Sequence, residues 1–356
     1  MGVSESIFIN GRFLGQELSG VQRFAREIIE QLSYRLLNLV ILAPKSVKLD
    51  SFFGIPIRKV GISYGYLWEQ FELPIYLLAK GSPLLINFGN IAPAFYRRQI
   101  ITLHDIAFIL HKEWYSKSFK TIYGLVVPII VKRSLHILTV SKTEKKNILH
   151  QFNINDSRIS VLYNGIPSNF LNLSPEDLLT DQIKEPYILS VASFNPRKNL
   201  STLISAFERL GQSDLQLVLV GRTGKAFGNI DLDKHIADDS RIIHMSDVDD
   251  LSLARLYYNA KAFIFIPFYE GFGIPLIEAS FFGCPVICSD LEVFKEIGLE
   301  NMKYVNPLKT EEIANAMQEV LNSNKRREIV KGEGFDYKNS AEILFSIIDK
   351  YTSKPL

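Results

Sequence analysis

Residues 269–278, with the sequence YEGFGIPLIE, are the most informative part of this chain. They follow the apolar run Ala262 to Ile266, which is typical of a buried strand. Gly271 and Gly273 permit a tight turn and a close backbone approach, and Pro275 suits the first turn of a helix. A helix that begins outside the carboxyl end of a buried strand points free N–H groups outward, so this turn predicts a phosphate site.

Two carboxylates flank the predicted phosphate site. Glu270 lies in the turn, and Glu278 lies about two helical turns further along. Carboxylates accept hydrogen bonds from hydroxyl groups and do not bind phosphate, so the pair indicates a ligand that is part phosphate and part sugar. An ordinary strand, turn and helix with one capping and one solvated Glu is the alternative. The spacing of the two carboxylates around both glycines and the proline favours the ligand.

A second turn of the same kind carries positive charge. Residues 195–199, NPRKN, separate a strand that ends at Val191 from a helix that begins near Leu200. Arg197 and Lys198 therefore lie at the same sheet edge as Glu270. A lysine about 4 Å from a phosphate oxygen interacts by roughly 4 kcal/mol at an effective dielectric of 20. An exposed basic turn is the alternative; the equivalent placement of the two turns favours phosphate binding.

Length and composition indicate a folded protein with more than one core. A chain of 356 residues is long enough for two domains. Its 47% hydrophobic and 22% charged residues are typical of globular proteins, and the longest apolar stretch, Ile122 to Val131, is too short to span a bilayer. No cluster of histidine, cysteine and glutamate has zinc-ligand spacing.

Alternating apolar runs and helical patterns predict parallel sheets covered by helices, formed twice along the chain. We place domain boundaries at 1–170 and 171–335, with residues 167–186 as a linker and a final amphipathic segment from Asn339 to Tyr351. The predicted strands are 6–9, 39–42, 84–87, 99–103, 136–140, 159–162, 187–191, 215–220, 241–244, 262–266 and 285–289. The predicted helices are 21–32, 119–132, 200–210, 250–259, 274–282 and 311–321.

Charge is unevenly distributed between the two halves. Residues 1–170 hold 20 Lys and Arg against 11 Asp and Glu, and residues 97–146 hold ten against three. Scattered solvated side chains are one interpretation. The other is a basic face that attracts an anionic membrane surface or an anionic acceptor. We expect no nucleic-acid partner, because no recognised nucleic-acid-binding motif accompanies the charge.

Ordered along the chain, these motifs resemble the retaining family 4 glycosyltransferases, which have the GT-B fold. Residues 196–200 are similar to the diphosphate motif of that family, and residues 270–278 to its E-x7-E motif. Residues 9–14 with 19–24 resemble the amino-terminal segment of bacterial members, and residues 103–105 and 139–141 resemble two further motifs. Residues 335–341 resemble the start of the carboxyl-terminal helix.

The resemblance implies two Rossmann-like domains with parallel sheets facing across a cleft, and a helix at about 336–356 that returns to the first domain. It assigns catalytic roles to Glu270, His104 and Lys198. His104 would face the sugar. Donor contacts would come from the side chains of Arg197, Lys198, Glu278 and Arg222, the backbone N–H groups of Phe272, Gly273 and Ile274, and the close approach that Gly20 permits. As isolated features, Gly20 is a plain helix start and His104 a histidine satisfied by its neighbours.

Ser193 departs from the family pattern, which often has arginine there, and Arg197 or Arg222 would supply the missing cation. The implied reaction moves a hexose, with mannose favoured, from a GDP- or UDP-sugar to a saccharide or lipid-diphosphate-linked acceptor for a surface polysaccharide. The expected place is the cytoplasm, at the inner face of the plasma membrane, with no metal and no other cofactor.

Two alternative functions remain open. Asp247 and Asp249 have the spacing of the Asp-x-Asp metal signature of cation-dependent sugar transferases, as do Asp231 and Asp233. A helix beginning near Asp250 makes helix capping the favoured role for the first pair. The second alternative is a non-catalytic protein that binds a sugar nucleotide within an assembly complex.

Overall fold

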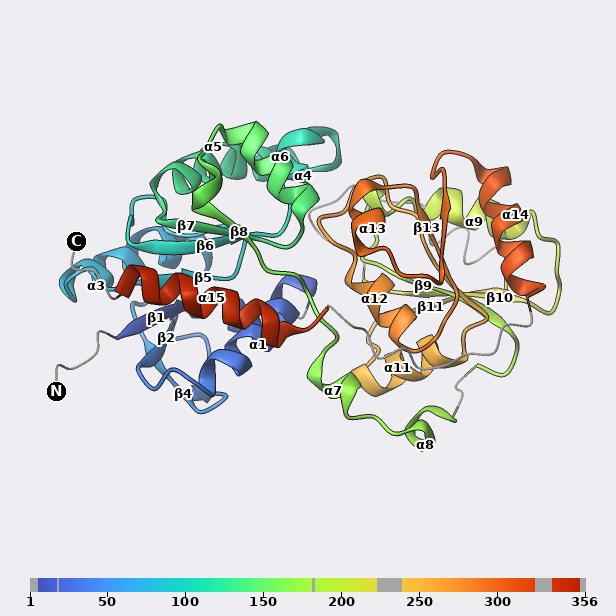
Figure 1. Cartoon of the computed structure of the whole chain (residues 1–356), viewed down its shortest axis with the longest axis horizontal. Coiled ribbons are helices and arrows are strands. Elements are labelled where there is room, and N and C mark those ends of the chain that lie inside the picture. The colour runs from blue at the N-terminus through green and yellow to red at the C-terminus, as the bar shows by residue number, and fades with distance from the viewer. Residues whose placement is uncertain (1–5, 18, 181–182, 223–238, 324–334, 353–356) are drawn as a thin grey trace. The chain divides into compact units, whose positions relative to one another are not determined.

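A computed structural model describes residues 6–17, 19–180, 183–222, 239–323 and 335–352. The chain divides into two compact units (Figure 1). The first unit contains residues 1–109, 120–164 and 336–356, and the second contains 110–119 and 165–335. Residues 110–119 and 165–170, which we place in the first domain from the sequence, therefore belong to the second unit. The carboxyl-terminal segment belongs to the first unit.

The first unit is built on an eight-stranded sheet in the order β3-β4-β2-β1-β5-β6-β7-β8. All of its pairings are parallel except that of β3 with β4. Its central strands are buried along almost their whole length because both faces of the sheet are covered, and their few polar residues, such as Asn10, Asn87 and Gln99, are buried with them. The strands are β1 (Ile7–Asn10), β2 (Leu39–Ala43), β3 (Ser51–Phe52), β4 (Ile55–Lys59), β5 (Leu85–Asn87), β6 (Gln99–Leu103), β7 (His136–Thr139) and β8 (Ile159–Val161).

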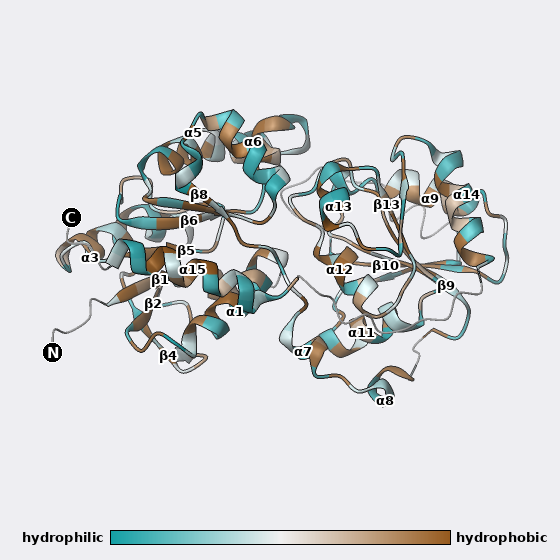
Figure 2. Ribbon diagram, in the orientation of Figure 1, coloured by the Kyte–Doolittle hydropathy of each residue, from teal (hydrophilic) through white to brown (hydrophobic). Residues whose placement is uncertain are grey.

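The second unit is a six-stranded, fully parallel sheet in the order β11-β10-β9-β12-β13-β14. Counted along the chain, this is the order 3-2-1-4-5-6 of a Rossmann fold, whose topological switch point lies between β9 and β12. Its strands are coloured mainly as hydrophobic in Figure 2. They are β9 (Tyr187–Val191), β10 (Gln216–Val220), β11 (Ile242–Met245), β12 (Ala262–Phe265), β13 (Val286–Ser289) and β14 (Met302–Val305).

Helices connect the strands of both sheets, as the alternating pattern predicts. In the first unit they are α1 (Gly20–Ser33), α2 (Gly65–Leu67), the π-helical turn η2 (Trp68–Glu72), α3 (Leu73–Ala79), α4 (Ala107–Leu110), α5 (Lys117–Arg133), α6 (Lys142–Phe152) and α15 (Tyr337–Thr352), although α4 ends and α5 begins in residues assigned to the second unit. In the second they are α7 (Ser168–Leu171), α8 (Pro175–Leu178), α9 (Leu200–Glu208), α11 (Asp250–Asn259), α12 (Ile274–Phe281), α13 (Glu292–Ile297) and α14 (Thr310–Leu321). The sequence patterns did not predict β3, β4, β14, the helical segment 65–79, α4, α6 or α13, and they assigned α7 and α8 to a linker.

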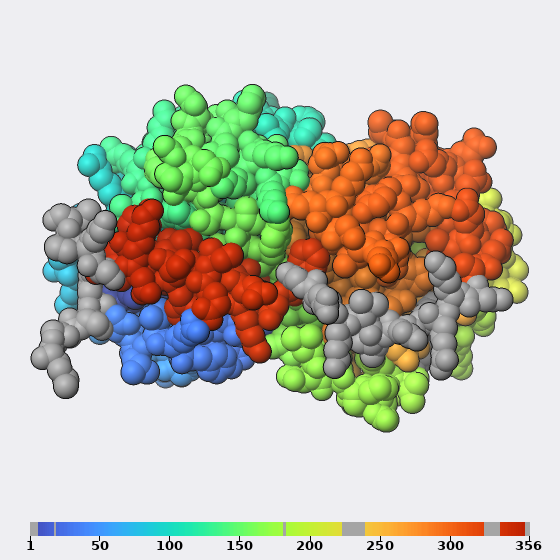
Figure 3. All heavy atoms as spheres, in the orientation of Figure 1, coloured from blue at the N-terminus to red at the C-terminus, as the bar shows by residue number. Residues whose placement is uncertain are grey.

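Helix α15 completes the first unit. It packs against α1, and Figure 3 shows it in red along the surface of this unit, next to the blue amino-terminal residues. Its buried face includes Leu344, Ile347 and Ile348. The predicted return of the carboxyl-terminal helix is thus explained by its amphipathic pattern, because its apolar side chains fill a surface that α1 leaves uncovered.

The segment expected to be a linker is part of the second unit. Helices α7 and α8 pack on α11, where Arg255 donates to the backbone oxygen of Asp177 at 2.7 Å and Asn259 to that of Leu178 at 3.1 Å. Phe170 and Leu178 are fully buried there, so their burial overrides the turn-rich composition. Among the described residues, no helix combines the length and apolar character that crossing a membrane requires.

Candidate functional site

The two predicted turns meet at the switch point of the second sheet. The turn 195–199 follows β9 and the turn 266–273 follows β12, and these two strands are hydrogen-bonded neighbours. The backbone N–H of Phe268 donates to the backbone oxygen of Arg197 at 2.9 Å, which ties one turn to the other. Ligands of doubly wound sheets bind at such a point, so the arrangement matches the expected phosphate site.

Lys198 and Glu270 form an ion pair at the centre of this site. The Lys198 Nζ donates to Glu270 Oε2 at 2.7 Å, and the Arg197 guanidinium lies 3.9 Å from the same oxygen. The side chains of Lys198 and Glu270 are only 8% and 15% exposed. Water screens such a pair less than it screens a surface ion pair, so the charges hold each other firmly. The Lys198 ammonium also lies 4.9 Å from the centre of the Phe265 ring.

Asn199 holds the two turns in place. Its backbone is left-handed, with φ of 58°, a conformation that asparagine tolerates better than most residues. Its side-chain amide donates to the backbone oxygens of Ile266 at 3.2 Å and Pro307 at 2.7 Å. Beside it, the Asn195 amide donates to Ser193 Oγ at 2.9 Å. Ser193 therefore helps to order the cationic turn.

The predicted backbone donors lie at the start of α12. Gly273 has φ of 121° and precedes Ile274, the first residue of the helix. Phe272 is buried, with its ring edge against Phe335 at a centroid distance of 5.6 Å. The N-cap residue, Gly273, has no side chain with which to cap the helix, and the orientation and dipole of this helix end favour an anion.

Glu278 lies deeper than expected for a residue that contacts a ligand. It is only 3% exposed and accepts a hydrogen bond from the Tyr257 hydroxyl at 3.0 Å. Tyr257, from α11, was not identified from the sequence, where it is one of many aromatic residues in a helical pattern. The contact of Glu278 with a ribose hydroxyl stays a prediction.

Arg222 follows β10 and forms an ion pair with Asp247. Its backbone oxygen accepts from the Phe194 N–H at 2.9 Å, next to the turn that carries Arg197 and Lys198. The replacement of the missing arginine by Arg197 or Arg222 stays a prediction. Asp249 caps α11 by accepting from the Ser252 backbone N–H at 2.9 Å. The capping role of the 247–250 segment thus agrees with the geometry. Asp231 and Asp233 lie outside the described residues.

His104 lies in the first unit, just after β6. Its Nε2 is 2.8 Å from the backbone oxygen of Phe88, and its backbone N–H donates to Asn90 Oδ1 at 2.7 Å. Its ring packs edge-on against Phe24 of α1. Burial lowers the pKa of His104, partly opposed by the Phe88 hydrogen bond and by Asp105, so the neutral imidazole is favoured at neutral pH.

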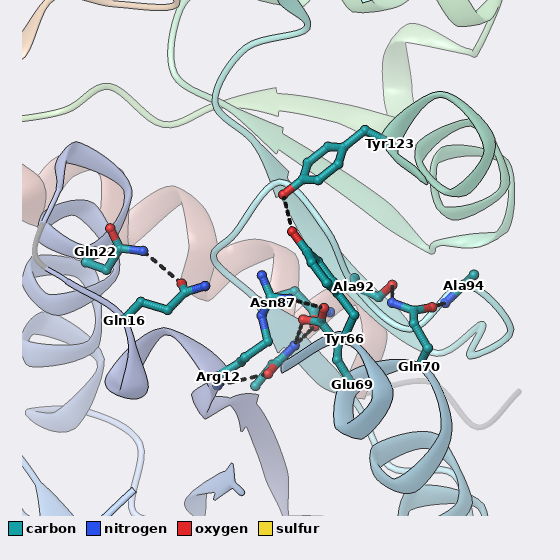
Figure 4. Close-up of polar contacts among 11 residues, drawn as sticks. Arg12, Gln16, Gln22, Tyr66, Glu69, Gln70, Asn87, Ala92, Ala94 and Tyr123 are labelled. Atoms are coloured by element: carbon teal, nitrogen blue, oxygen red, sulfur yellow. Dashed lines mark hydrogen bonds and ion pairs between the residues drawn. The ribbon is translucent and has the colours of Figure 1, made fainter. Parts of the chain in front are cut away.

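Gly20 is the first residue of α1 and is exposed. The Ser19 hydroxyl before it donates to the Gln22 side chain, whose amide donates to Gln16 Oε1 at 2.9 Å (Figure 4). The turn is therefore held by side chains of its own loop, and the close approach of a ligand to Gly20 stays a prediction.

A buried polar network in the first unit was not predicted. Asn10, at the end of β1, donates to Glu69 Oε1 at 2.7 Å and to Asn87 Oδ1 at 2.9 Å. Arg12 lies 3.0 Å from Glu69 Oε2 and over the Tyr66 ring (Figure 4). Burial raises the pKa of Glu69 to about 7, although Arg12 and the hydrogen bonds lower it. Sequence periodicity could not reveal Glu69, because its helical segment is apolar on both faces and shows no boundary between core and surface.

Comparison with known proteins shows which family and which fold this chain resembles. Residues 179–335 match the family described as "Glycosyl transferases group 1". The O-antigen chain mannosyltransferase RfbU of Salmonella typhimurium is 32% identical over 246 residues, covering 68% of this chain and 66% of that protein. The serotype-specific mannosyltransferase WbdA of Escherichia coli is 27% identical over 271 residues, covering 68% of this chain and 32% of that protein. The chain thus spans just under two thirds of the first relative's length and about a third of the second's.

A solved structure with the same fold is that of Anabaena HepE in complex with UDP-glucose. It has a TM-score of 0.75 and 18% identity, with 98% of this chain and 100% of that chain covered. The predicted fold class is confirmed. Residues 179–335 belong to the group 1 glycosyltransferase family, and the chain has the GT-B fold, with two Rossmann-like domains.

Proposed function

We propose that this protein transfers a hexose, with mannose as the favoured sugar, from a nucleotide diphosphate sugar to a saccharide or lipid-linked saccharide acceptor. The acceptor would belong to a growing cell-surface polysaccharide, and the anomeric configuration of the hexose would be retained. The donor is a GDP- or UDP-sugar.

The ion pair of Lys198 and Glu270 carries this proposal. It joins a cation suited to phosphate with a carboxylate suited to hydroxyl groups, within 2.7 Å of each other. In a nucleotide sugar, one oxygen atom joins the terminal phosphate to the sugar ring. Such a donor therefore holds its phosphate close to its sugar hydroxyls. Its phosphate can replace Glu270 as the partner of Lys198, and its hydroxyls can replace Lys198 as the partner of Glu270.

The chemistry requires that negative charge on the departing diphosphate be stabilised. Lys198 and Arg197 supply positive charge, and the N-terminus of α12 supplies backbone N–H groups in a fixed orientation. These groups act without a metal ion. Glu270 would accept from hydroxyls of the transferred hexose and hold its ring in line with the leaving oxygen.

The identity of the sugar rests on the relatives. RfbU and WbdA are both named mannosyltransferases, and RfbU is named for the O-antigen chain. We extend these assignments to this chain as mannose transfer into a surface polysaccharide. A lipid-diphosphate-linked acceptor would place the reaction in the cytoplasm at the inner face of the plasma membrane, and the basic excess of residues 1–170 supports contact with anionic lipid.

The test is turnover of GDP-mannose and UDP-glucose, measured as released nucleotide, together with the unfolding temperature of the protein in each donor. Saturation at a hundred times Kd stabilises the folded state by about 2.7 kcal/mol. Glu270→Gln and Lys198→Met are each expected to lower kcat by about 10²–10³-fold. Each single variant also removes the nearest opposite charge from its partner, so the double variant should be more stable than either single one but equally inactive.

A matched control is the ion pair between Asp239 and Arg241, which is also partly buried in the second unit. Arg241→Met should lower stability and leave kcat near that of the unmodified protein. Full turnover by Glu270→Gln would remove the proposed role. Stabilisation by a donor without nucleotide release, whatever the acceptor, would instead indicate a non-catalytic binding protein.

A further inference from the structure

The helical segment 65–79 of the first unit, formed by α2, η2 and α3, exposes an apolar surface. Leu67, Phe71, Ile75 and Leu78 are 65%, 62%, 65% and 62% exposed. Their spacing of four, four and three residues places them on one face of the helix. We refer to these four side chains as the apolar face. Such a face normally carries charged residues, so its exposure requires an explanation.

The opposite face of this segment packs on the sheet. Trp68, Leu73 and Leu77 are fully buried and belong to a cluster with Phe8 of β1 and Leu85 of β5. The segment is therefore anchored as firmly as an ordinary core helix. The apolar face is not needed for the hydrophobic core of the first unit, because a separate set of side chains already supplies that contact.

Polar side chains of the segment are used for contacts inside the unit. The Gln70 amide donates to the backbone oxygen of Ala92 at 2.8 Å and accepts from the Ala94 N–H at 3.0 Å (Figure 4). Glu72 accepts from the backbone N–H groups of Ile62 and Ser63. Every exposed residue from 66 to 79 is apolar or aromatic.

Cations contact aromatic side chains of this helical segment and of the loop beside it. Arg58 donates to the Tyr76 hydroxyl at 2.8 Å, and Lys80, directly after α3, lies 5.8 Å from the Tyr76 ring. On the neighbouring loop, Phe95 is 71% exposed and lies under the Arg133 guanidinium at 5.1 Å. The apolar surface is thus accompanied by basic groups, and no exposed residue from 66 to 80 is acidic.

We propose that the apolar face inserts into the interfacial region of an anionic lipid bilayer. Apolar side chains on a helix surface enter the boundary between headgroups and acyl chains, while the adjacent cations contact anionic headgroups. A second copy of the chain fits less well. A symmetric dimer through this face would bring the same cations together without carboxylates to balance them. Membrane insertion would bring the enzyme to a lipid-linked acceptor, and only this consequence rests on the proposed function.

The experiment measures binding of the full-length chain to vesicles by cosedimentation. The vesicles contain phosphatidylcholine alone or with phosphatidylglycerol. The double variant Phe71→Gln/Ile75→Gln is compared with Leu37→Gln/Leu308→Gln, which removes two apolar side chains that are 100% and 74% exposed elsewhere. We expect the first variant to weaken binding to the anionic vesicles by about tenfold or more, and the control to stay within about twofold of the unmodified protein. Vesicles without phosphatidylglycerol should bind less well.

Equal binding by the unmodified protein and the Phe71→Gln/Ile75→Gln variant would overturn the inference, as would equal binding to neutral and anionic vesicles. A dimer in sedimentation equilibrium that this variant disrupts, without vesicle binding, would assign the face to a second copy. Vesicle binding requires no acceptor. Absence of donor turnover by the unmodified protein, with vesicle binding intact, would therefore refute the proposed activity and leave the membrane surface standing.

Discussion

Single residues decide the geometry of the candidate donor site. Asn199 takes a left-handed conformation, and its one amide group anchors both the β12 turn and the segment at Pro307. Gly273 takes φ of 121° immediately before α12. Few other residues reach these conformations at low cost, so the positions of Lys198 and of the α12 N-terminus depend on them.

Gly273→Ala tests this dependence. An added Cβ would lie 2.9 Å from Phe294 Cε1 and 3.1 Å from Leu276 Cδ1, in a backbone conformation that alanine rarely adopts. We expect a loss of about 2–4 kcal/mol in the free energy of unfolding, measured with urea, and weaker stabilisation by the donor.

Gly211→Ala is the matched control, because its φ of 61° is also positive but nothing lies within 4 Å of the added Cβ. It should cost only about 1–2 kcal/mol and leave donor binding unchanged. Equal losses in the two variants would show that collision with Phe294 is unimportant.

Contacts between elements explain how α15 stays attached to the first sheet. His136, at the start of β7, lies 2.9 Å from Ser160 Oγ of β8 and 3.3 Å from the Tyr351 hydroxyl of α15. That hydroxyl donates to the backbone oxygen of Leu135 at 3.0 Å. The contacts are satisfied by a neutral ring with its proton on Nδ1. Burial, together with the nearby cations Lys350, Arg158 and Lys145, lowers the pKa of His136 to about 4.

The low pKa of His136 predicts a loss of stability in mild acid. The unfolded chain binds this proton at a pKa of about 6.5, whereas the folded protein resists it until about pH 4. The contribution of neutral His136 to the free energy of unfolding is complete above pH 6.5. It is lost as the pH falls to 4, and the loss is at most about 3 kcal/mol. His136→Gln should flatten this part of the stability profile, measured by urea unfolding at pH 7 and pH 4.5. His150→Gln, at an exposed position, should retain it; an unchanged profile in His136→Gln would contradict the assignment.

For the molecule as a whole, two separate cores imply two separately perturbable units. Leu203 belongs to the core cluster of the second unit, and Leu344 of α15 is fully buried in the first. The chain crosses from one unit to the other and returns for α15, so the carboxyl-terminal residues stabilise the unit that contains the amino terminus.

Leu203→Ala and Leu344→Ala should therefore lower different transitions in calorimetry. Each removes a buried side chain, which costs about 2–5 kcal/mol in the unit that contains it. We expect the donor to raise the temperature of one of the two unfolding transitions. Leu203→Ala should lower the temperature of that transition, and Leu344→Ala should leave it nearly unchanged. A single transition that both variants lower equally would show that the units unfold together.

Most of the fold was predictable from sequence because its signals are local. Each predicted strand and helix appears in the structure, since apolar runs and 3.6-residue periodicity reflect burial within one element. The segment 65–79 was missed because it is apolar on both faces and contains Pro74, so no periodic pattern separates core from surface. Helices α7 and α8 were taken for a linker because their composition is typical of turns.

The sequence alone established two Rossmann-like domains, two turns rich in ligand-binding groups, and a family resemblance. Only the tertiary structure showed that Lys198 and Glu270, 72 residues apart, bind each other, that Glu278 is buried against Tyr257, and that Arg222 pairs with Asp247. The physical reason is that turn chemistry depends on neighbouring residues, whereas pairing depends on strand order. β9 and β12 become neighbours only when the sheet forms, and that step places the cation beside the carboxylate.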